Sequence, residues 1–328
     1  MAKRYSNDYL TLMAKEADYG TAVLDYTAST DKGRTLPDKS DFKESTAKIT
    51  TSQKTGTNMQ NEHSILAGYK SVDVSLSGEL TIGPAAVESP HDMLFQGFFS
   101  TATTPFTVPA IGTTPYSFTM FQAFGAEAVY NQVTSAVFQT LNISGSSGET
   151  IKYDATMRGQ GITREVANAD GTILTPNPPT GPVQPDLAPI LFCSATMNPW
   201  LGNAAAKSFN SFQLSMTNTL GDDKSSFQNS CTRGIETYNG FSGTLSMEWD
   251  YDSTTDSTAY NNIVGTLVST TIVLTGAATK TITLTMHGKI SEYSAPDPDS
   301  GIFVGTATVD LLETIGGTDA ISIATAYA

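Results

Sequence analysis

The sequence predicts a mainly β protein, in which two tandem and similar domains each form a β-sandwich or barrel-forming unit with one short helix. Hydrophobic residues make up 39% of the 328 residues and charged residues only 15%, which is typical of a folded chain. Thr, Ser and Gly are abundant, and this favours strands and turns. A strand followed by a short helix occurs at 71–99 and again at 241–267.

The first copy begins with strict alternation of apolar and polar residues, which predicts a strand with one buried face. Gly78 interrupts the alternation, and Gly83-Pro84 ends it. Its apolar residues are Val72, Val74, Leu76, Leu80 and Ile82. Ser89 can then cap a helix whose first residue is Pro90. The predicted helix carries one apolar stripe, formed by Met93, Leu94, Gly97 and Phe98.

The second copy repeats this order of elements. The segment 242–247 (SGTLSM) lines up with 77–82 (SGELTI), so Leu245 and Met247 are expected on a matching wall strand. A second helical stripe is predicted from Tyr260, Ile263, Val264 and Leu267. Four landmark pairs, Phe42/Phe209, Gly78/Gly243, Gly97/Gly265 and Met120/Met286, are separated by 165 to 168 positions. The pattern indicates an internal duplication.

Composition divides the chain further. The stretch 166–190 contains six prolines, which exclude a helix or an inner strand and indicate an extended linker. The stretch 50–67 is almost entirely polar and predicts a long exposed loop, a feature that usually has a function. The predicted plan is an N-terminal arm (1–40), a first domain (41–165), the linker (166–190), a second domain (191–315) and a C-terminal tail (316–328).

The net charge and the lengths of the apolar runs exclude several classes of function. The formal net charge of −14 argues against binding of nucleic acid through phosphate neutralisation. No secretory leader pattern and no run of about 18 apolar residues is present, so neither secretion nor a membrane-spanning helix is expected. Cys193 and Cys231 are expected to be reduced, structural thiols.

The residues that carry catalytic or metal chemistry do not form recognisable patterns. His63, His91 and His287 lack metal-ligand spacing, and the two cysteines lack a nearby partner for zinc. Two turns with alternating aspartates, at 250–252 and 297–301, lack the glutamate that completes a calcium loop. No catalytic residue, metal site or cofactor is therefore expected.

Six segments resemble the major tail tube proteins of long-tailed, siphovirus-like bacteriophages. They are Lys15–Ala22 (KEADYGTA), the strand motif at 77–81 (SGELT), Met93–Phe98 (MLFQGF), Ser117–Met120 (SFTM), Thr140–Gly145 (TLNISG) and Met157–Gly159 (MRG). The resemblance covers about 9–165, and the second half repeats its core. It implies a structural virion protein whose β domains join into rings. The rings stack into a hollow tail tube, and the genome DNA leaves through the lumen.

The resemblance also implies partners. Tube rings of this family are normally sixfold, so two tube domains in one chain suggest a trimeric ring with pseudo-sixfold symmetry. The expected partners are other copies of the chain and the tape measure, tail terminator and tail tip proteins. DNA is expected to pass without specific binding, along a lumen in which Asp and Glu outnumber Lys and Arg. Assembly is expected in the host cytoplasm, and the final location is the virion tail.

Three groups of site residues follow from this interpretation. Contacts between rings are expected from the arm and the loop at Tyr9, Tyr19, Thr55, Asn58, Gln60, Asn61 and His63. Inner-wall strands are expected at Val72, Val74, Leu80, Ile82, Leu245 and Met247. Helix packing is expected at Met93, Leu94, Phe98, Tyr260, Ile263, Val264 and Leu267.

Other interpretations remain open. An adhesin or capsid-decoration protein would also be acidic and rich in Thr, but it would form a discrete oligomer. A carbohydrate-active enzyme would need paired carboxylates around a cleft, and the sequence signals none. The polar loop could also be a surface excursion without a role in assembly.

Overall fold

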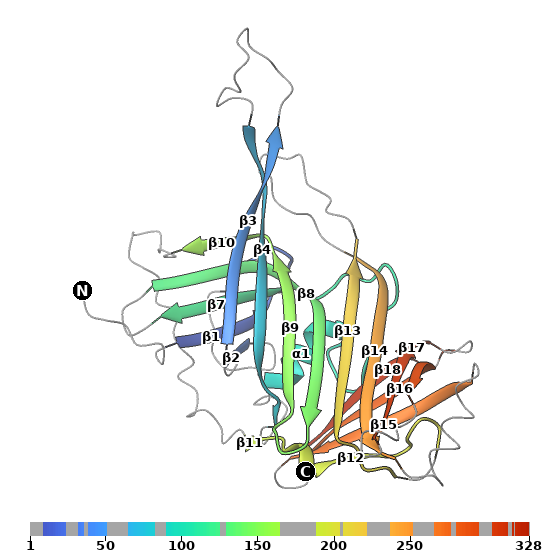
Figure 1. Cartoon of the computed structure of the whole chain (residues 1–328). Helices are drawn as coiled ribbons and strands as arrows, with labels where there is room; N and C mark the ends of the chain where they lie inside the picture. Colours follow the sequence, from blue (N-terminus) through green and yellow to red (C-terminus); the bar gives the residue numbers. More distant parts are fainter. Residues whose placement is uncertain are drawn as a thin grey trace.

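The structure is a computed structural model of the whole chain (Figure 1). It describes all residues except 1–8, 24–31, 36–38, 51–64, 83–89, 125–128, 165–187, 204–205, 222–236, 252–265, 277–279, 295–303, 314–316, 318 and 328. The described part is mainly β, with large antiparallel sheets, as the sequence predicts.

The described part of the first half consists of ten strands and one helix. They are β1 (Tyr9–Lys15), β2 (Lys32–Thr35), β3 (Lys39–Thr50), β4 (Ile65–Glu79), β5 (Thr81–Ile82), β6 (Phe106–Thr107), β7 (Phe118–Phe124), β8 (Val129–Ser146), β9 (Lys152–Gly159) and β10 (Gly161–Arg164), with helix α1 (Pro90–Phe99) after β5.

The second half continues with further strands and one short 3-10 helix. They are β11 (Ala188–Pro189), β12 (Ala195–Met197), β13 (Ser211–Leu220), β14 (Tyr238–Asp250), β15 (Leu267–Thr275), β16 (Thr281–Ser294), β17 (Val304–Leu311) and β18 (Ile321–Ala326), with the 3-10 helix at Phe192–Ser194.

One continuous antiparallel sheet, here called the central sheet, joins the two halves. Its strand order is β3-β4-β9-β8-β13-β14-β17-β16. The first half supplies the strands up to β8, and the second half supplies those from β13 onwards. Figure 1 shows the middle strands upright and side by side. The β8–β13 pairing joins the halves within the central sheet, and it is called the internal seam below.

Two long strands, β8 and β16, leave the central sheet and enter flanking sheets. The first part of β8 pairs with β7 and β10, and β7 pairs with β1, which pairs with β2. The first part of β16 pairs with β15 and β18, while β15 pairs with β12 and β18 with β6. A flanking sheet therefore lies beside each half of the central sheet, and β6 of the first half joins the one beside the second half.

The two halves pair their strands in the same order. The first half runs β3-β4-β9-β8-β7-β1 and the second runs β13-β14-β17-β16-β15-β12. The strands β10 and β18 take the same place beside β8 and β16. A register shift also falls at matching points, between Phe138 and Thr140 in β8 and between Ile290 and Glu292 in β16.

These pairings change the alignment of the halves. Starting from the matched register shifts, Val74 pairs with Met157 and Leu245 pairs with Val309. Val74 therefore corresponds to Leu245, and Val72 corresponds to Gly243. The sequence instead aligns Gly78 with Gly243. Alternation specifies which face a residue occupies, but a slide by an even number of residues preserves it, so the pattern could not determine the register.

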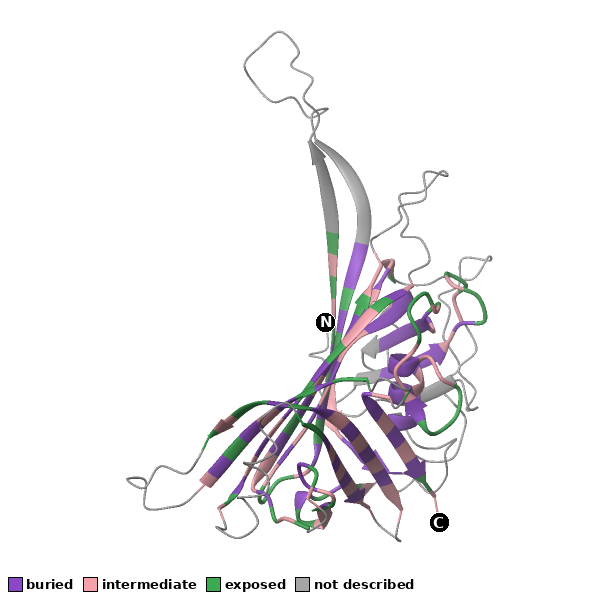
Figure 2. Cartoon of the chain, turned by 90° about the vertical axis from the view of Figure 1, so that its right-hand side faces the viewer, coloured by how far each residue is buried: buried purple, intermediate pink, exposed green. Residues whose placement is uncertain are grey.

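The core lies between the central sheet and the flanking elements, and Figure 2 shows the alternation of buried and less buried residues along the strands. Helix α1 packs on β8, as the stripe predicts, with Met93, Leu94 and Phe98 buried. Gly97 allows this close approach. A Cβ at this position would lie 2.3 Å from a ring carbon of Phe138 and 2.8 Å from one of Phe118.

The Lys15–Ala22 segment has a structural role. The carboxylate of Glu16 is buried and accepts hydrogen bonds from the amides of Gly20 (3.1 Å) and Ser135 (2.8 Å). It also accepts from the hydroxyls of Ser117 (2.8 Å) and Thr119 (2.9 Å). A single acid thus joins the end of β1 to β7 and β8. This satisfies the charge that burial would otherwise penalise.

Several element boundaries differ from the sequence prediction. The predicted arm (1–40) contains β1, which pairs with β7, and β2, which pairs with β1. The predicted tail (316–328) contains β18. Leu80 lies just beyond β4, and Ile82 lies in β5, which pairs with β11 in a separate small sheet, so neither residue belongs to the central sheet. Leu267 begins β15 and is 40% exposed, so its assignment to a helix is wrong.

Candidate functional site

The central sheet has one apolar face, which forms the core, and one polar face. Along β13, Phe212, Leu214 and Met216 are buried, while the residues between them are more exposed. Cross-strand partners share a face, so the register extends the polar face from strand to strand. Its small polar residues include Ser75, Ser77, Thr156, Asn142, Ser144, Ser215, Thr244, Ser246, Thr306 and Thr308.

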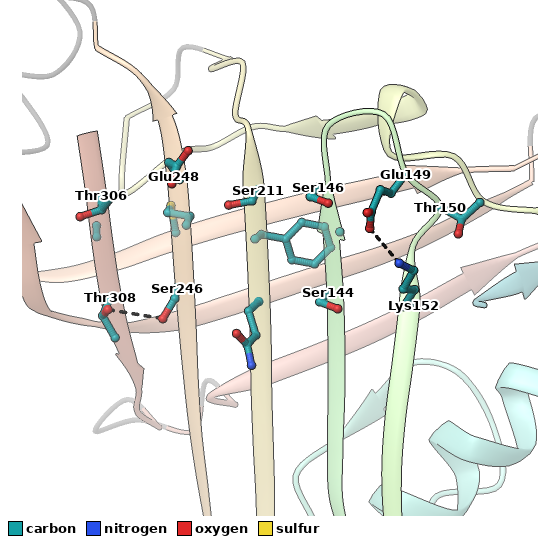
Figure 3. Close-up of a pocket in the computed structure, with 15 residues that line it drawn as sticks. Ser144, Ser146, Glu149, Thr150, Lys152, Ser211, Ser246, Glu248, Thr306 and Thr308 are labelled. Atoms are coloured by element: carbon teal, nitrogen blue, oxygen red, sulfur yellow. Dashed lines mark hydrogen bonds and ion pairs between the residues drawn. The ribbon is translucent and has the colours of Figure 1, made fainter. Parts of the chain in front are cut away.

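A depression lies on this polar face across the internal seam, as Figure 3 shows. Its labelled side chains come from β8, β9, β13, β14 and β17 and from the turn after β8. Ser246 and Thr308 approach to 3.4 Å between their hydroxyl oxygens. At the rim, the Lys152 Nζ donates to Glu149 Oε2 at 2.8 Å. This hydrogen bond lowers the pKa of Glu149 and raises that of Lys152.

Acidic residues outnumber basic residues on the described part of the polar face. The acidic residues are Asp41, Asp73, Glu79, Asp154, Glu248, Asp250, Glu292 and Asp310, and the basic residues are Lys43, Lys152, Arg158 and Lys289. Such a face offers hydroxyl and carboxylate groups with few cations. It does not suit the neutralisation of phosphate groups.

A long hairpin made of β3 and β4 extends from one end of the central sheet. Figure 1 shows the two strands continuing together well beyond the other strands. Their pairing runs from Lys39 with Ser77 to Thr50 with Ile65. The sequence predicts a loop over 50–67, and the structure instead continues the strands to Thr50 and resumes them at Ile65. The hairpin can therefore reach beyond the body of its own subunit.

Side chains from β13 and β14 also bond the second half to helix α1 of the first. The Phe98 carbonyl, at the end of α1, accepts from the Asn218 amide nitrogen at 2.8 Å and from the Tyr238 hydroxyl at 3.0 Å. The Ser100 hydroxyl lies 3.0 Å from the same Tyr238 oxygen. Burial raises the pKa of Tyr238 to about 12, so this phenol stays protonated. The second half thus caps the helix of the first.

A second cluster connects the halves near β18. Tyr327, which follows β18, lies against His91 and Asp92 in the first turn of α1. His91 is fully buried, and its Nδ1 donates to the Thr81 carbonyl. The helix that the sequence predicts from Pro90 puts His91 in its first turn, and the structure confirms this position. No signal in the sequence connects it with Tyr327, because the two residues are far apart along the chain.

The remaining predicted site residues lie in three different settings: in the central sheet, in or near β1, and outside the described residues. Val72, Val74, Leu245 and Met247 lie in the central sheet and point to the core. Tyr9 lies in β1, and Tyr19 is half-buried in the turn after it. The other predicted residues between rings (Thr55, Asn58, Gln60, Asn61 and His63) and the second helical stripe (Tyr260, Ile263 and Val264) lie outside the described residues.

The described residues offer little for metal chemistry. Among them, no group of three or more His, Cys, Asp and Glu side chains is arranged to hold a metal ion. Cys193 is exposed and has a free thiol. Of the helices in the described ranges, none is long and apolar enough to cross a membrane.

Comparison with known proteins identifies the family. No curated protein matches the chain. The family model described as phage tail tube protein matches residues 7–323, which is nearly the whole chain. This match includes both halves of the central sheet and the hairpin. The chain therefore belongs to the phage tail tube protein family.

Proposed function

We propose that this protein forms stacked rings that build the hollow tail tube of a phage virion, and that the polar face of the central sheet lines the lumen. One observation carries the proposal. The face is polar and predominantly acidic, and it continues without a break across the two halves of the chain. A lining of this kind repels the phosphates of DNA, so a duplex can slide through without being held.

We also infer that the two halves are copies of one tube domain. The matching pairing order and the matching register shifts support this inference. If each half contributes one sixth of a ring, three chains close a ring with pseudo-sixfold symmetry. The hairpin of β3 and β4, with the loop between its strands, would then contact the neighbouring ring.

The partners and location follow from the same proposal. Copies of the chain are the main partners, and the tape measure, tail terminator and tail tip proteins would meet the inside and the ends of the tube. The subunit would assemble in the host cytoplasm and remain in the virion tail. A scaffold of this kind has a structural role and needs no enzyme activity.

Negative-stain electron microscopy of the purified protein tests the proposal. Hollow tubes with a regular axial repeat are expected, and their cross-section should contain three chains. Discrete particles of uniform size would contradict the tube and favour an adhesin or a capsid-decoration protein instead.

A further inference from the structure

We propose that neighbouring chains in a ring join through an external seam, in which the outer edge of β3 in one copy pairs antiparallel with residues 290–294 of β16 in the next. This proposal rests on the tube function above and specifies which edges meet and in which register. The partner is a second copy of this chain.

The internal seam is the template. There β8 and β13 run antiparallel, with Thr140 opposite Thr217 and Asn142 opposite Ser215. In the pairing order of the halves, β8 has the same place as β16, and β13 has the same place as β3. A second seam of the same construction would therefore join β16 to β3.

Within the described strands, each end of the central sheet has a paired strand on one side only. Among the described strands, β3 pairs with β4 alone, and the 290–294 part of β16 pairs with β17 alone. The two strands form opposite ends of the central sheet and are not paired with each other in this chain. Natural proteins usually cover or pair an exposed strand edge. Pairing between copies would cover both edges at once.

The register of the external seam follows from residues that lie opposite one another on successive strands, here called rows. The matching rows are Val137, Arg158, Asp73 and Lys43 in the first half, and Lys289, Asp310, Thr244 and Ser215 in the second. Lys43 thus takes the place of Ser215. Glu292 takes the place of Thr140, since both follow the register shift of their strand. When the β8–β13 pairings are applied to the corresponding residues of β16 and β3, Ser45 lies opposite Glu292 and Lys43 lies opposite Ser294.

Charge complementarity supports this register. Lys43 and Glu292 are both exposed on the polar face, and the transfer makes them diagonal neighbours about 7–8 Å apart. Both side chains are long enough to meet over that distance. At the internal seam the corresponding residues, Ser215 and Thr140, are uncharged. Opposite charges at the external seam would select the correct edge and register during assembly.

Engineered disulfides test the register directly. In a background with Cys193→Ser and Cys231→Ser, the pair Ser45→Cys and Glu292→Cys should link neighbouring copies when the assembled protein is oxidised. A non-reducing gel should then show a ladder of linked chains that ends at three for a trimeric ring, and reduction should collapse it.

Two control pairs in the same background calibrate this result. Thr140→Cys with Thr217→Cys lies across the internal seam and should link within one chain, without a change in mass. Ser45→Cys with Thr308→Cys moves the second thiol to β17, one strand or about 4.8 Å further away. This pair should form no link, because a disulfide cannot bridge that separation.

Charge reversal gives an independent test. Glu292→Lys should lower the fraction of protein that sediments as tubes, and the double variant with Lys43→Glu should restore it. Glu248→Lys lies on the same face but inside the sheet, so its assembly should equal that of the unmodified protein. Tubes that form without a link between Ser45→Cys and Glu292→Cys would overturn the seam and leave the tube function intact. An unmodified protein that forms no tubes would instead overturn the tube function.

Discussion

Tyr327 Oη lies 2.5 Å from the Oδ2 atom of Asp92, so the segment after β18 is bonded to the helix of the first half. The same hydroxyl lies 3.1 Å from His91 Nε2. These contacts lie on the core side, away from the polar face. Together with the internal seam, the bonds of Asn218 and Tyr238 to Phe98 and the β5–β11 and β6–β18 pairings, they hold the two halves at several places. If the protein forms the proposed ring, these contacts would keep its two halves in a fixed relation within the wall.

Removing the Tyr327 hydroxyl should lower the free energy of unfolding. Tyr327→Phe keeps the ring but leaves the buried Asp92 carboxyl without this partner, at a cost of about 1–3 kcal/mol. Urea denaturation of the unassembled subunit measures the change. Tyr251→Phe, at a half-buried position outside the cluster, is the matched control and should change stability by less than about 0.5 kcal/mol. Equal stability of Tyr327→Phe and the unmodified protein would show that the bond contributes nothing.

The pH dependence of stability should reveal two opposing groups. Burial raises the pKa of Asp92 to about 6, so its contribution to stability is present below about pH 4 and is lost as the pH rises to 6. Burial lowers the pKa of His91 to about 4. The unfolded chain therefore binds a proton that the folded chain does not, and the His91 contribution grows as the pH rises from 4 to 6.5. The two effects nearly cancel.

Single substitutions should separate the contributions of Asp92 and His91 to the pH dependence of stability. Relative to the unmodified protein, Asp92→Asn should gain stability as the pH rises from 4 to 6, and His91→Gln should lose stability over the same range. Each change should be on the order of 2–3 kcal/mol. Thermal or urea unfolding of the unassembled subunit at several pH values measures the slopes. Two slopes of the same sign would contradict this account of the cluster.

Gly97→Ala should destabilise the subunit, although alanine is the better helix former. The added methyl group would overlap the ring of Phe138, and overpacking of this kind costs about 1–3 kcal/mol. Gly240→Ala provides the control, since nothing lies within 4 Å of a Cβ at Gly240. Calorimetry should show a lower Tm for Gly97→Ala alone. A raised Tm would mean that helix propensity outweighs packing at this position.

Deleting Thr55–Ser64 should leave a folded subunit that no longer forms tubes, because only residues 51–54 would then connect β3 to β4 and the residues proposed to contact the next ring would be gone. The strands from Lys39 to Thr50 and from Ile65 to Glu79 would remain. Circular dichroism checks folding, and electron microscopy checks assembly. A variant with a Gly-Ser segment of equal length separates the effect of length from that of side chains. Tubes of normal length in the deletion variant would exclude the segment from stacking.

Reversing charge on the polar face should turn the tube into a DNA-binding surface. Asp154→Lys combined with Glu248→Lys adds cations to the proposed lumen, and the affinity for DNA should fall steeply as salt increases. Filter binding of short duplex DNA to assembled tubes at several salt concentrations measures this effect. Glu313→Lys, which follows β17 outside the central sheet, should bind no more DNA than the unmodified protein. Strong binding by the unmodified tube would contradict a repelling lumen.

Much of the fold could be predicted locally. The alternation of Val72, Val74 and Leu76 predicts a strand with one buried face, and the structure confirms it. The stripe of Met93, Leu94 and Phe98 likewise predicts α1. Side chains of a strand repeat every two residues and those of a helix every 3.6, so neighbouring positions alone reveal each element and its buried face.

The sequence by itself determined that this chain is mainly β, that its strands have one buried and one polar face, and that the stripe of Met93, Leu94 and Phe98 lies on a helix. The tertiary structure alone decided the register that matches Val74 with Leu245, the seam of β8 with β13 and the meeting of Tyr327 with Asp92. Periodicity is a local property of the chain. Register and contacts between distant segments depend on which strands share hydrogen bonds, and an even shift along a strand leaves the periodic pattern unchanged.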